Sequence, residues 1–159
     1  MVGSSSSSVV RPQTGERRPR ARRSEYASFR QMTTRWRDND VYGHVNNVVY
    51  FEFVDSSVNR WLIEEGGLDI PSGPVIGLVV ESACVYHDAL AYPDRVETGL
   101  RVSRIGNSSV QYEVGIFRAG EEPAVAEARF THVYVDRETR RPVRLPDGLR
   151  AALGGLRRK

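Results

Sequence analysis

The stretch from Arg35 to Asn47, RWRDNDVYGHVNN, places two aspartates, a glycine, a histidine and two adjacent asparagines directly ahead of a run of large apolar residues. Asp, Asn and Gly are common at turns and helix N-caps, because they tolerate tight backbone conformations or bond nearby N–H groups. Taken alone, the stretch therefore predicts a turn that leads into a helix. The concentration of polar groups at this junction also makes it a candidate functional site.

The residues after this turn have the spacing of a helix. Over residues 45–65 the apolar positions fit a helical repeat: Val45, Val48, Val49, Phe53, Val54, Val58, Trp61 and Leu62. Tyr50 and Phe51 make this helix apolar over most of its circumference, which is typical of a buried helix. About 20 residues give a length of ~30 Å, the diameter of a small domain. We expect Gly66 and Gly67 to end it.

Five other segments predict strands, because apolar residues alternate along them or run continuously: Ser28–Arg37, Val75–His87, Arg95–Ile105, Ser109–Arg118 and Ala124–Asp136. Turn residues separate the last four strands, and a short C-terminal helix is expected to begin near Pro146. One strand, one long helix and four strands predict an α+β fold, an antiparallel sheet wrapped around the helix. Apolar residues remain on the outer face of the sheet, so we expect a second copy to cover it or to extend its edge.

Length and composition predict one soluble domain. The chain has 159 residues, 40% of them hydrophobic, which is enough to bury a single core. The single cysteine, Cys84, excludes a disulfide framework or a thiolate metal cage within one chain and fits a reducing compartment. No apolar run is long enough to span a bilayer, so we expect a cytoplasmic protein with no membrane partner.

The basic character of the chain belongs to its N-terminal tail. Residues 1–23 contain six arginines and one glutamate, a net charge of +5, so the rest of the chain carries −2 of the total of +3. The tail is rich in serine and has almost no large apolar residue, so it cannot bury enough surface to fold. We predict a disordered tail, residues 1–24, and a single domain, residues 25–155. A basic tail could bind nucleic acid or anionic lipid, but we expect a solvated extension and no nucleic-acid partner.

The order of the predicted elements, with DNDVYGHVNNVVY between the first strand and the helix, resembles the hotdog fold. In particular it is similar to the 4-hydroxybenzoyl-CoA thioesterase-like branch of the acyl-CoA thioesterases, which carries a D-x-D-x-x-G-x-V-x-x-x-x-Y motif at this place. The matching residues are Asp38, Asp40, Gly43, Val45 and Tyr50, and HVNN at residues 44–47 matches a frequent variant. The resemblance covers residues 28–150 and leaves the N-terminal tail outside.

The resemblance implies hydrolysis of an acyl-CoA or aryl-CoA thioester to the free acid and coenzyme A, with an ester of acyl carrier protein as the alternative. Coenzyme A is part of the substrate, so no separate cofactor is expected. In this branch the second aspartate of the motif is the catalytic carboxylate, which is Asp40 here. Backbone N–H groups at the start of the helix polarise the thioester carbonyl, and by position the Asn47 N–H is our candidate.

The chemistry of a thioester is consistent with these residue types. A thiol with a pKa of about 8.5 leaves without strong protonation. The enzyme therefore needs a carboxylate that attacks the carbonyl or activates a water, and donors aimed at the developing oxyanion. A helix N-terminus supplies unpaired N–H groups and a partial positive charge. Whether Asp40 attacks directly or through water stays open, as does the alternative that it is only a helix cap.

Other residues of the motif have weaker assignments. Gly43 permits a tight turn or a close approach of the substrate, and Tyr50 is a further substrate-binding candidate through the motif. His44 either orients the carbonyl or bonds the backbone. Glu81 follows an apolar run in a predicted strand, where a carboxylate needs a reason. In other hotdog branches a carboxylate from a neighbouring subunit completes the site, so Glu81 is a second catalytic candidate, with an outward-facing strand residue as the alternative. Asp38 is expected to be structural.

Coenzyme A carries phosphates, which arginines bind well. Arg104 is the candidate by position, because it lies beside the turn at residues 106–109, and Ser108 in this turn is a further substrate-binding candidate. Some relatives carry basic residues in this turn, where this chain has Gly106 and Asn107. Arg95 or an arginine of a partner subunit is the alternative, and each of these arginines is otherwise a solvated surface charge.

Several classes of function are excluded by missing motifs. The sequence has no G-x-S-x-G elbow of a serine hydrolase and no glycine-rich phosphate loop. His87 and His132 lack partners at ligand spacing, so we expect no metal site. The alternative to an enzyme is a non-catalytic hotdog dimer that binds acyl-CoA as a sensor or regulator. In either case we expect a homodimer or a homotetramer.

Overall fold

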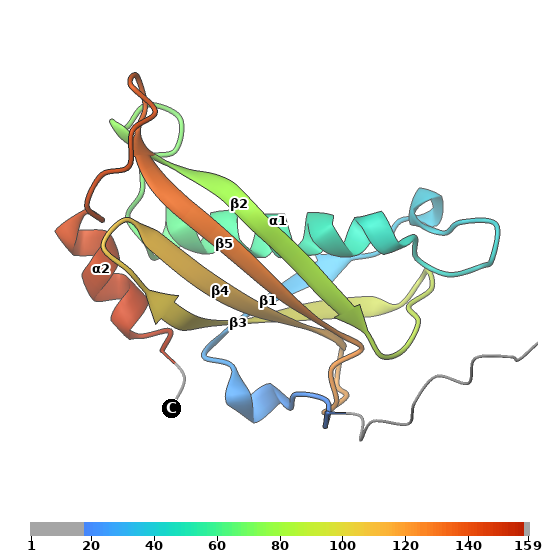
Figure 1. The fold of residues 1–159 in the computed structure, drawn as a ribbon. Helices are drawn as coiled ribbons and strands as arrows, with labels where there is room; N and C mark the ends of the chain where they lie inside the picture. Colours follow the sequence, from blue (N-terminus) through green and yellow to red (C-terminus); the bar gives the residue numbers. More distant parts are fainter. Residues whose placement is uncertain (1–17, 158–159) are drawn as a thin grey trace, which may run out of the picture.

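Five strands and two α-helices follow one another along the part of the chain that the computed structural model describes, residues 18–157. Their bounds are β1 Ser28–Thr33, α1 Asn47–Glu64, β2 Val75–Tyr86, β3 Arg95–Ile105, β4 Ser109–Arg118, β5 Ala126–Asp136 and α2 Asp147–Gly154. All neighbouring strands are antiparallel, in the order β1-β3-β4-β5-β2. The helix α1 lies across one face of this sheet, and α2 lies near the turn between β3 and β4 (Figure 1). The predicted α+β fold, an antiparallel sheet around one long helix, is confirmed.

The helix α1 begins and ends where its flanking residues require. At its start the side chain of Asn46 accepts a hydrogen bond from the Val48 N–H at 3.1 Å, which satisfies one of the free donors of the first turn. At its end a side chain on Gly66 would have its Cβ 2.9 Å from the Cα of Leu62, and Gly67 has a φ of +66°. Both positions favour glycine, so the helix cannot continue.

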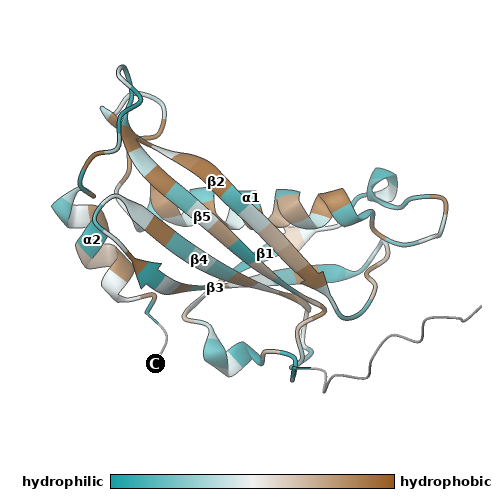
Figure 2. Ribbon diagram, viewed as in Figure 1, coloured by the Kyte–Doolittle hydropathy of each residue, from teal (hydrophilic) through white to brown (hydrophobic). Residues whose placement is uncertain are grey.

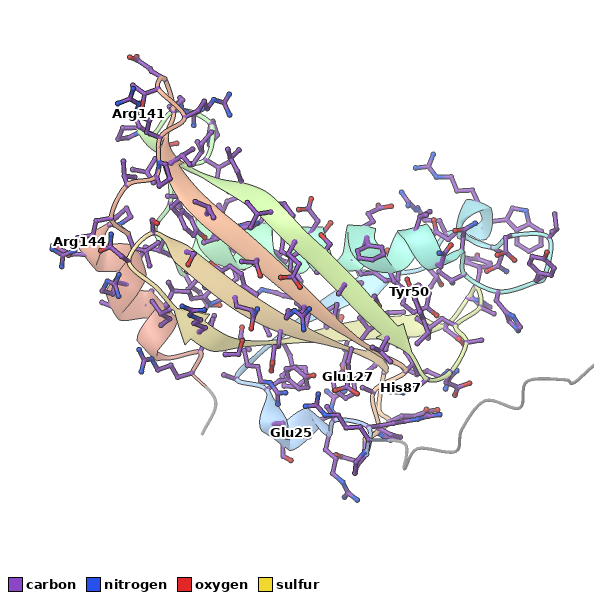
Figure 3. The ribbon with its side chains drawn as sticks, viewed as in Figure 1. Glu25, Tyr50, His87, Glu127, Arg141 and Arg144 are labelled. Atoms are coloured by element: carbon purple, nitrogen blue, oxygen red, sulfur yellow. The ribbon has the colours of Figure 1, made fainter. Side chains whose placement is uncertain are left out.

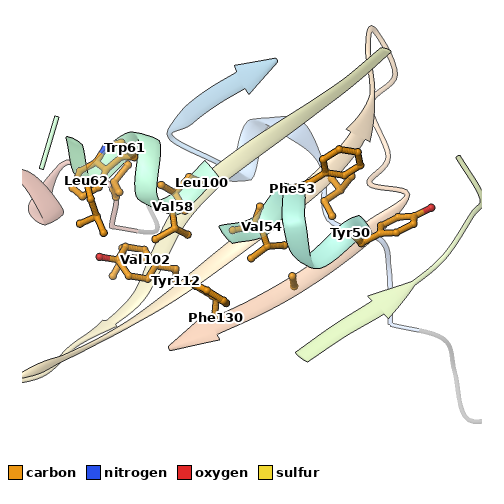
Figure 4. Packing of buried hydrophobic residues seen from close by; sticks show 14 of the residues in the cluster. Tyr50, Phe53, Val54, Val58, Trp61, Leu62, Leu100, Val102, Tyr112 and Phe130 are labelled. Atoms are coloured by element: carbon orange, nitrogen blue, oxygen red, sulfur yellow. The ribbon is translucent and has the colours of Figure 1, made fainter. Parts of the chain in front are cut away.

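The core lies between α1 and the sheet (Figure 4). The side of α1 that faces the sheet buries eight residues: Val49, Tyr50, Phe53, Val54, Ser57, Val58, Trp61 and Leu62. Alternate residues of β3, β4 and β5 pack against them: Val96, Leu100, Val102, Val110, Tyr112, Val114, Ile116, Ala126, Ala128 and Phe130. Burial of this apolar surface supplies most of the driving force for folding. The other side of α1 is open to solvent in the single chain, where Val48 is 63% exposed, so burial over most of the circumference is not observed.

The edge strand β2 leaves apolar side chains exposed. Val80 is 59% exposed, Val79 and Val85 are also exposed, and apolar residues cover much of this strand (Figure 2). A register irregularity between Val79 and Glu81 interrupts the pairing of β2 with β5. The free edge of β2 has no neighbouring strand within the described residues. An apolar sheet edge of this kind favours pairing with another chain.

A short N-terminal segment covers part of the outer face of the sheet (Figure 1). The ring of Tyr26 lies against Gly99 and Gly115 and meets the ring of Phe117 edge-on at 5.6 Å. Ala21 is buried, and its carbonyl accepts the Ala124 N–H at 3.0 Å. The predicted tail spanned residues 1–24. Its first 17 residues lie outside the described residues, whereas Arg20, Ala21 and Arg23 contact the domain.

The predicted strand over residues 28–37 is too long, because β1 ends at Thr33. The side chain of Thr34 donates to the Asp94 carbonyl at 2.7 Å, and the Asp38 carboxylate accepts the Arg35 N–H at 2.7 Å. These bonds stabilise a 3₁₀ turn at Trp36–Asp38 in place of an extended chain. The predicted bounds of β3 and β4 are confirmed. None of the helices in residues 18–157 is long and apolar enough to cross a membrane.

Candidate active site

The polar stretch between β1 and α1 forms a tight turn beyond the start of the helix (Figure 1). The Asp40 N–H donates to the His44 carbonyl at 2.9 Å, and the Gly43 N–H donates to the Asp40 carbonyl at 3.0 Å. Gly43 has a φ of +80°, a conformation that side chains disfavour. The turn therefore needs a glycine at this position, and it returns the chain to the helix within a few residues of Asp40.

Hydrogen bonds on both sides fix this turn to the domain. Asp38 is 3% exposed, and its carbonyl accepts the Asn46 N–H at 2.8 Å. The Val45 N–H donates to the Leu90 carbonyl at 2.7 Å, and the Tyr92 N–H donates to Oδ1 of Asn39 at 3.0 Å. The buried carboxylate of Asp38 also pairs with Arg35. Asp38 is thus placed where a structural residue would be, as the sequence predicted.

A shallow groove of about 550 Å³, open to solvent, lies beside the turn. Its lining comes from three parts of the chain: the turn, the start of α1, and the end of β2 with the residues after it. The lining residues are Asp40, Tyr42, His44, Val45, Asn47, Tyr50, Tyr86, His87, Asp88 and Ala89. Four predicted site residues, Asp40, His44, Asn47 and Tyr50, meet here. Gly43 shapes the turn without lining the groove.

The groove combines a carboxylate with the N-terminus of a helix. Oδ1 of Asp40 accepts the Tyr42 N–H at 2.9 Å, whereas Oδ2 has no hydrogen-bond partner among the described residues. The first N–H of α1, that of Asn47, likewise has no acceptor within residues 18–157. Such N–H groups carry the positive end of the helix dipole and bind developing negative charge. The groove therefore offers one free carboxylate oxygen and one free backbone donor.

Two tyrosines form the wall of the groove between α1 and β2. The rings of Tyr50 and Tyr86 meet edge-on with their centroids 5.0 Å apart. The Tyr50 hydroxyl accepts the Leu90 N–H at 3.2 Å, and the Tyr86 hydroxyl donates to the Asn47 carbonyl at 3.1 Å. Burial raises the pKa of both hydroxyls, that of Tyr86 to about 12. Both tyrosines are therefore protonated at neutral pH, and Tyr86 is a hydrogen-bond donor.

The sequence did not single out Tyr86, Asp88 or Ala89 as site residues. They lie roughly forty residues beyond the motif and reach the groove only because β2 ends beside the start of α1. The available signal was the stretch YHDA at residues 86–89, where polar residues gather at the end of a predicted strand. His87 lies at the same end of the molecule as Tyr50 and pairs with Glu127 at 2.7 Å (Figure 3).

Glu81 does not line the groove. It is exposed on β2, and its carboxylate forms an ion pair with Arg129 of β5. This placement agrees with the alternative that the sequence left open, an outward-facing strand residue. A catalytic role for Glu81 would require the groove of another subunit and stays a prediction.

Arg104 and Ser108 are distant from Asp40 within one chain. Both lie at the end of the sheet beside α2, whereas the Asp40 turn lies at the opposite end (Figure 1). Arg104 lines a separate hollow together with Arg157, and Arg150 of α2 donates to the Gly106 carbonyl at 2.7 Å. Binding of substrate by Arg104 and Ser108 therefore stays a prediction that needs a second subunit.

Metal ligands do not cluster in the described part of the chain. No three His, Cys, Asp or Glu side chains within residues 18–157 lie together as a metal site would require. The lone cysteine, Cys84, is partly buried on β2, and burial raises the pKa of its thiol. The groove thus presents side-chain carboxylates and imidazoles, together with the start of a helix.

Comparisons with known proteins agree with this geometry. The family profile of the thioesterase-like superfamily matches residues 34–153. The PA5185 protein from Pseudomonas aeruginosa strain PAO1 is 55% identical, with a TM-score of 0.87 over 89% of this chain and 99% of that one. A 1,4-dihydroxy-2-naphthoyl-CoA thioesterase from Synechocystis, 17% identical, has a TM-score of 0.72 over 79% and 94% of the two chains. The BH1999 gentisyl-coenzyme A thioesterase, 18% identical, has a TM-score of 0.71 over 79% and 99%. The fold is the hotdog fold that the sequence resembled, and the chain belongs to the thioesterase-like superfamily.

Proposed function

We propose that this thioesterase hydrolyses an acyl-CoA or aryl-CoA thioester to the free acid and coenzyme A. One observation carries the proposal: Asp40, which has a carboxylate oxygen without a partner in the described residues, and Asn47, whose N–H has no acceptor there, line the same groove. A volume of about 550 Å³ is in the usual range for a small-molecule site, about 300–1,000 Å³. The solved structures named above include two thioesterases of aryl-CoA esters, which supports this substrate class.

In this mechanism the thioester carbonyl oxygen accepts the Asn47 N–H, and the carbonyl carbon faces Asp40. The free Oδ2 of Asp40 either attacks the carbon or removes a proton from an attacking water. Direct attack forms an acyl–Asp40 anhydride and releases the coenzyme A thiolate, and water then hydrolyses the anhydride. In both routes negative charge develops on the carbonyl oxygen, where the Asn47 N–H and the helix dipole stabilise it. His44, on the same groove, orients the carbonyl or the water.

We propose that the active form is a homodimer or a homotetramer. The exposed valines of β2 and the exposed Val48 of α1 support this, because a single chain leaves them in water. A second subunit could also bring Arg104, Ser108 or Glu81 to the groove, which one chain does not. Size-exclusion chromatography with light scattering measures the state directly, and a monomer that turns over substrate would contradict the proposal.

The decisive experiment is a thiol-release assay over a panel of acyl-CoA and aryl-CoA esters, with Asp40→Asn beside the wild type. Loss of the carboxylate removes the nucleophile or base, so we expect kcat to fall by about 10³-fold or more. Asp69→Asn is the matched control. Asp69 also accepts a backbone N–H of its own turn, from Ser72 at 3.2 Å, but it does not line the groove.

Thermal unfolding checks that both variants are folded. We expect their unfolding midpoints to stay within a few degrees of that of the wild type. Wild-type turnover of Asp40→Asn would refute the assigned mechanism. Tight binding of acyl-CoA by the wild type without thiol release would instead support the sensor alternative.

A further inference from the structure

The first turn of α1 is held from two sides. From the loop side, the Asn46 side chain accepts the Val48 N–H at 3.1 Å. From the sheet side, the Tyr86 hydroxyl of β2 donates to the Asn47 carbonyl at 3.1 Å. Asn47 lies between these two bonds and has no intrahelical partner for its own N–H. The peptide unit that carries this N–H is held within the turn by the Asn46 carbonyl, which accepts the Val49 N–H at 3.0 Å. The position of the whole first turn beside the groove therefore depends on the bonds made by Asn46 and by Tyr86.

Only the hydroxyl of Tyr86 makes the bond to the Asn47 carbonyl, and neighbouring side chains hold the Tyr86 ring in place. Its ring packs edge-on against Tyr50, whose hydroxyl accepts the Leu90 N–H. Leu90 in turn accepts the Val45 N–H through its carbonyl. Tyr86 and Tyr50 thus connect the end of β2 and the loop after it to the start of α1. The hydroxyl of Tyr86 also stays protonated over the working pH range, because its pKa is raised to about 12 by burial and by neighbouring groups.

We propose that Tyr86 is a positioning residue for thioester hydrolysis, which holds the first turn of α1 so that the Asn47 N–H is aimed at the substrate carbonyl. This inference rests on the proposed function. Helix ends fray unless their terminal groups are bonded, and a misplaced oxyanion donor loses much of its effect. A hydrogen bond to the first helical residue opposes such fraying at the place where the donor is needed. Tyr86 acts through Asn47 and need not contact the reacting atoms.

The test is Tyr86→Phe, which keeps the ring and removes the hydroxyl. We expect kcat to fall about 10-fold, since a misplacement of about 1 Å can cost on the order of 100-fold. KM should stay within about twofold, because the Asn47 N–H matters most in the transition state. Tyr92→Phe is the matched control: Tyr86 and Tyr92 are both 41% exposed, but Tyr92 does not line the groove. A kcat of Tyr86→Phe equal to that of the control would overturn the proposal, and so would a rise in KM alone.

A second measurement does not depend on turnover. Amide hydrogen exchange at Val48 and Val49, whose N–H groups are bonded to Asn46, should be faster in Tyr86→Phe than in the wild type, whereas Tyr92→Phe should leave it unchanged. Exchange in the middle of α1 should be the same in all three proteins, which shows that the fold is intact. Unchanged exchange in the first turn would overturn the positioning role.

The two measurements separate the failure of this inference from the failure of the proposed function. If the wild type hydrolyses no thioester, the proposed function is wrong, and the exchange data still decide whether Tyr86 holds the helix start. If the wild type is active, Asp40→Asn is inactive and Tyr86→Phe matches the wild type in kcat, the function stands and only the positioning role is wrong.

A double-mutant cycle with Asn46→Ala sharpens the assignment. Asn46 and Tyr86 bond the two polar groups of one peptide unit, the Val48 N–H and the Asn47 carbonyl, so their effects on kcat should not be independent. We expect the loss in the double variant to differ from the product of the single losses by at least threefold. The pair Asn46→Ala and Tyr92→Phe should give the product. A simple product for Asn46 with Tyr86 would count against the shared action on this peptide unit.

Discussion

Two clusters of polar side chains in this molecule differ in what they offer a ligand. The groove cluster consists of Asp40, Asn47 and Tyr86 and lies at the start of α1, open to solvent. The core cluster consists of Tyr112, His132 and Tyr134 and lies on the face of the sheet that α1 covers. Both contain groups that can transfer protons, yet only the groove cluster combines a free carboxylate oxygen with a free backbone donor.

The polar groups of the core cluster are bonded mainly to each other. The hydroxyls of Tyr112 and Tyr134 are 2.7 Å apart, and Nδ1 of His132 lies 3.4 Å from the Tyr134 hydroxyl. His132 is 2% exposed, and burial lowers its pKa to about 4. Its Nε2 has no hydrogen-bond partner within the described residues. Perturbed pKa values are often taken as a sign of a functional site, but here the perturbed histidine is in the packed core and the candidate carboxylate is elsewhere.

In this fold, the groups that can react with a substrate are therefore better identified by their exposure to solvent than by the size of their pKa shifts. The core cluster should therefore govern stability, and the groove cluster should govern turnover.

Acid should destabilise the protein through His132 of the core cluster. His132 is neutral in the folded protein down to about pH 4, whereas the unfolded chain binds a proton below its ordinary value of 6.5. Stability from this group is therefore complete above pH 6.5 and is lost as the pH falls towards 4. We expect the free energy of unfolding to decrease by about 3 kcal/mol over this interval from His132 alone. Urea unfolding between pH 7.5 and 4 measures it.

The variant His132→Gln isolates this contribution, because it removes the titrating group and leaves the carboxylates in place. Its free energy of unfolding should vary less with pH than that of the wild type over the same interval. Parallel curves for the two proteins would show that the buried histidine does not cause the acid sensitivity.

Tyr134→Phe should have a smaller effect on stability. The change removes one hydroxyl of the bonded pair and leaves the Tyr112 hydroxyl without that partner in the core. We expect a loss of about 2 kcal/mol in the free energy of unfolding, since a buried polar group without a partner costs about 1–3 kcal/mol. The kcat for thiol release should stay that of the wild type at a temperature where both proteins are folded. A tenfold loss of kcat would place the core cluster in the active site and remove the contrast.

Periodicity was sufficient to predict most of the fold. The helical repeat predicted α1 to within two residues at each end, and alternation predicted β3 and β4. It failed where side chains compete with regular structure, because Thr34 and Asp38 bond backbone groups and end β1 early. Composition assigned residues 18–24 to the tail, since a charged segment with few apolar residues gives no sign that Ala21 is buried in a cluster with Phe117.

The candidate site was predictable where it is local in sequence. Asp40, His44, Asn47 and Tyr50 lie within one turn and the start of one helix, so their spacing brings them together. Tyr86 and the residues after it enter through the pairing of distant strands, which no local pattern encodes. Glu81 and Arg104 lie away from the groove of their own chain, so a role for either depends on how two chains assemble.

The smallest predicted effect on turnover comes from a comparison of alanine substitutions at two glycines. Gly43, in the turn of the groove cluster, has a φ of +80°, and Gly120, between β4 and β5, has a φ of +83°. A Cβ on either would meet no atom within 4 Å, so an alanine at each position costs only backbone strain. We expect each Gly→Ala variant to lose about 1 kcal/mol in the free energy of unfolding. Only Gly43→Ala should also lower kcat, by several-fold, because relaxation of its turn moves Asp40 relative to the Asn47 N–H. Urea unfolding measures the loss of stability in both variants, and thiol release measures their kcat. Because the backbone strain is matched, equal kcat values would mean that the geometry of the turn does not set the position of the carboxylate.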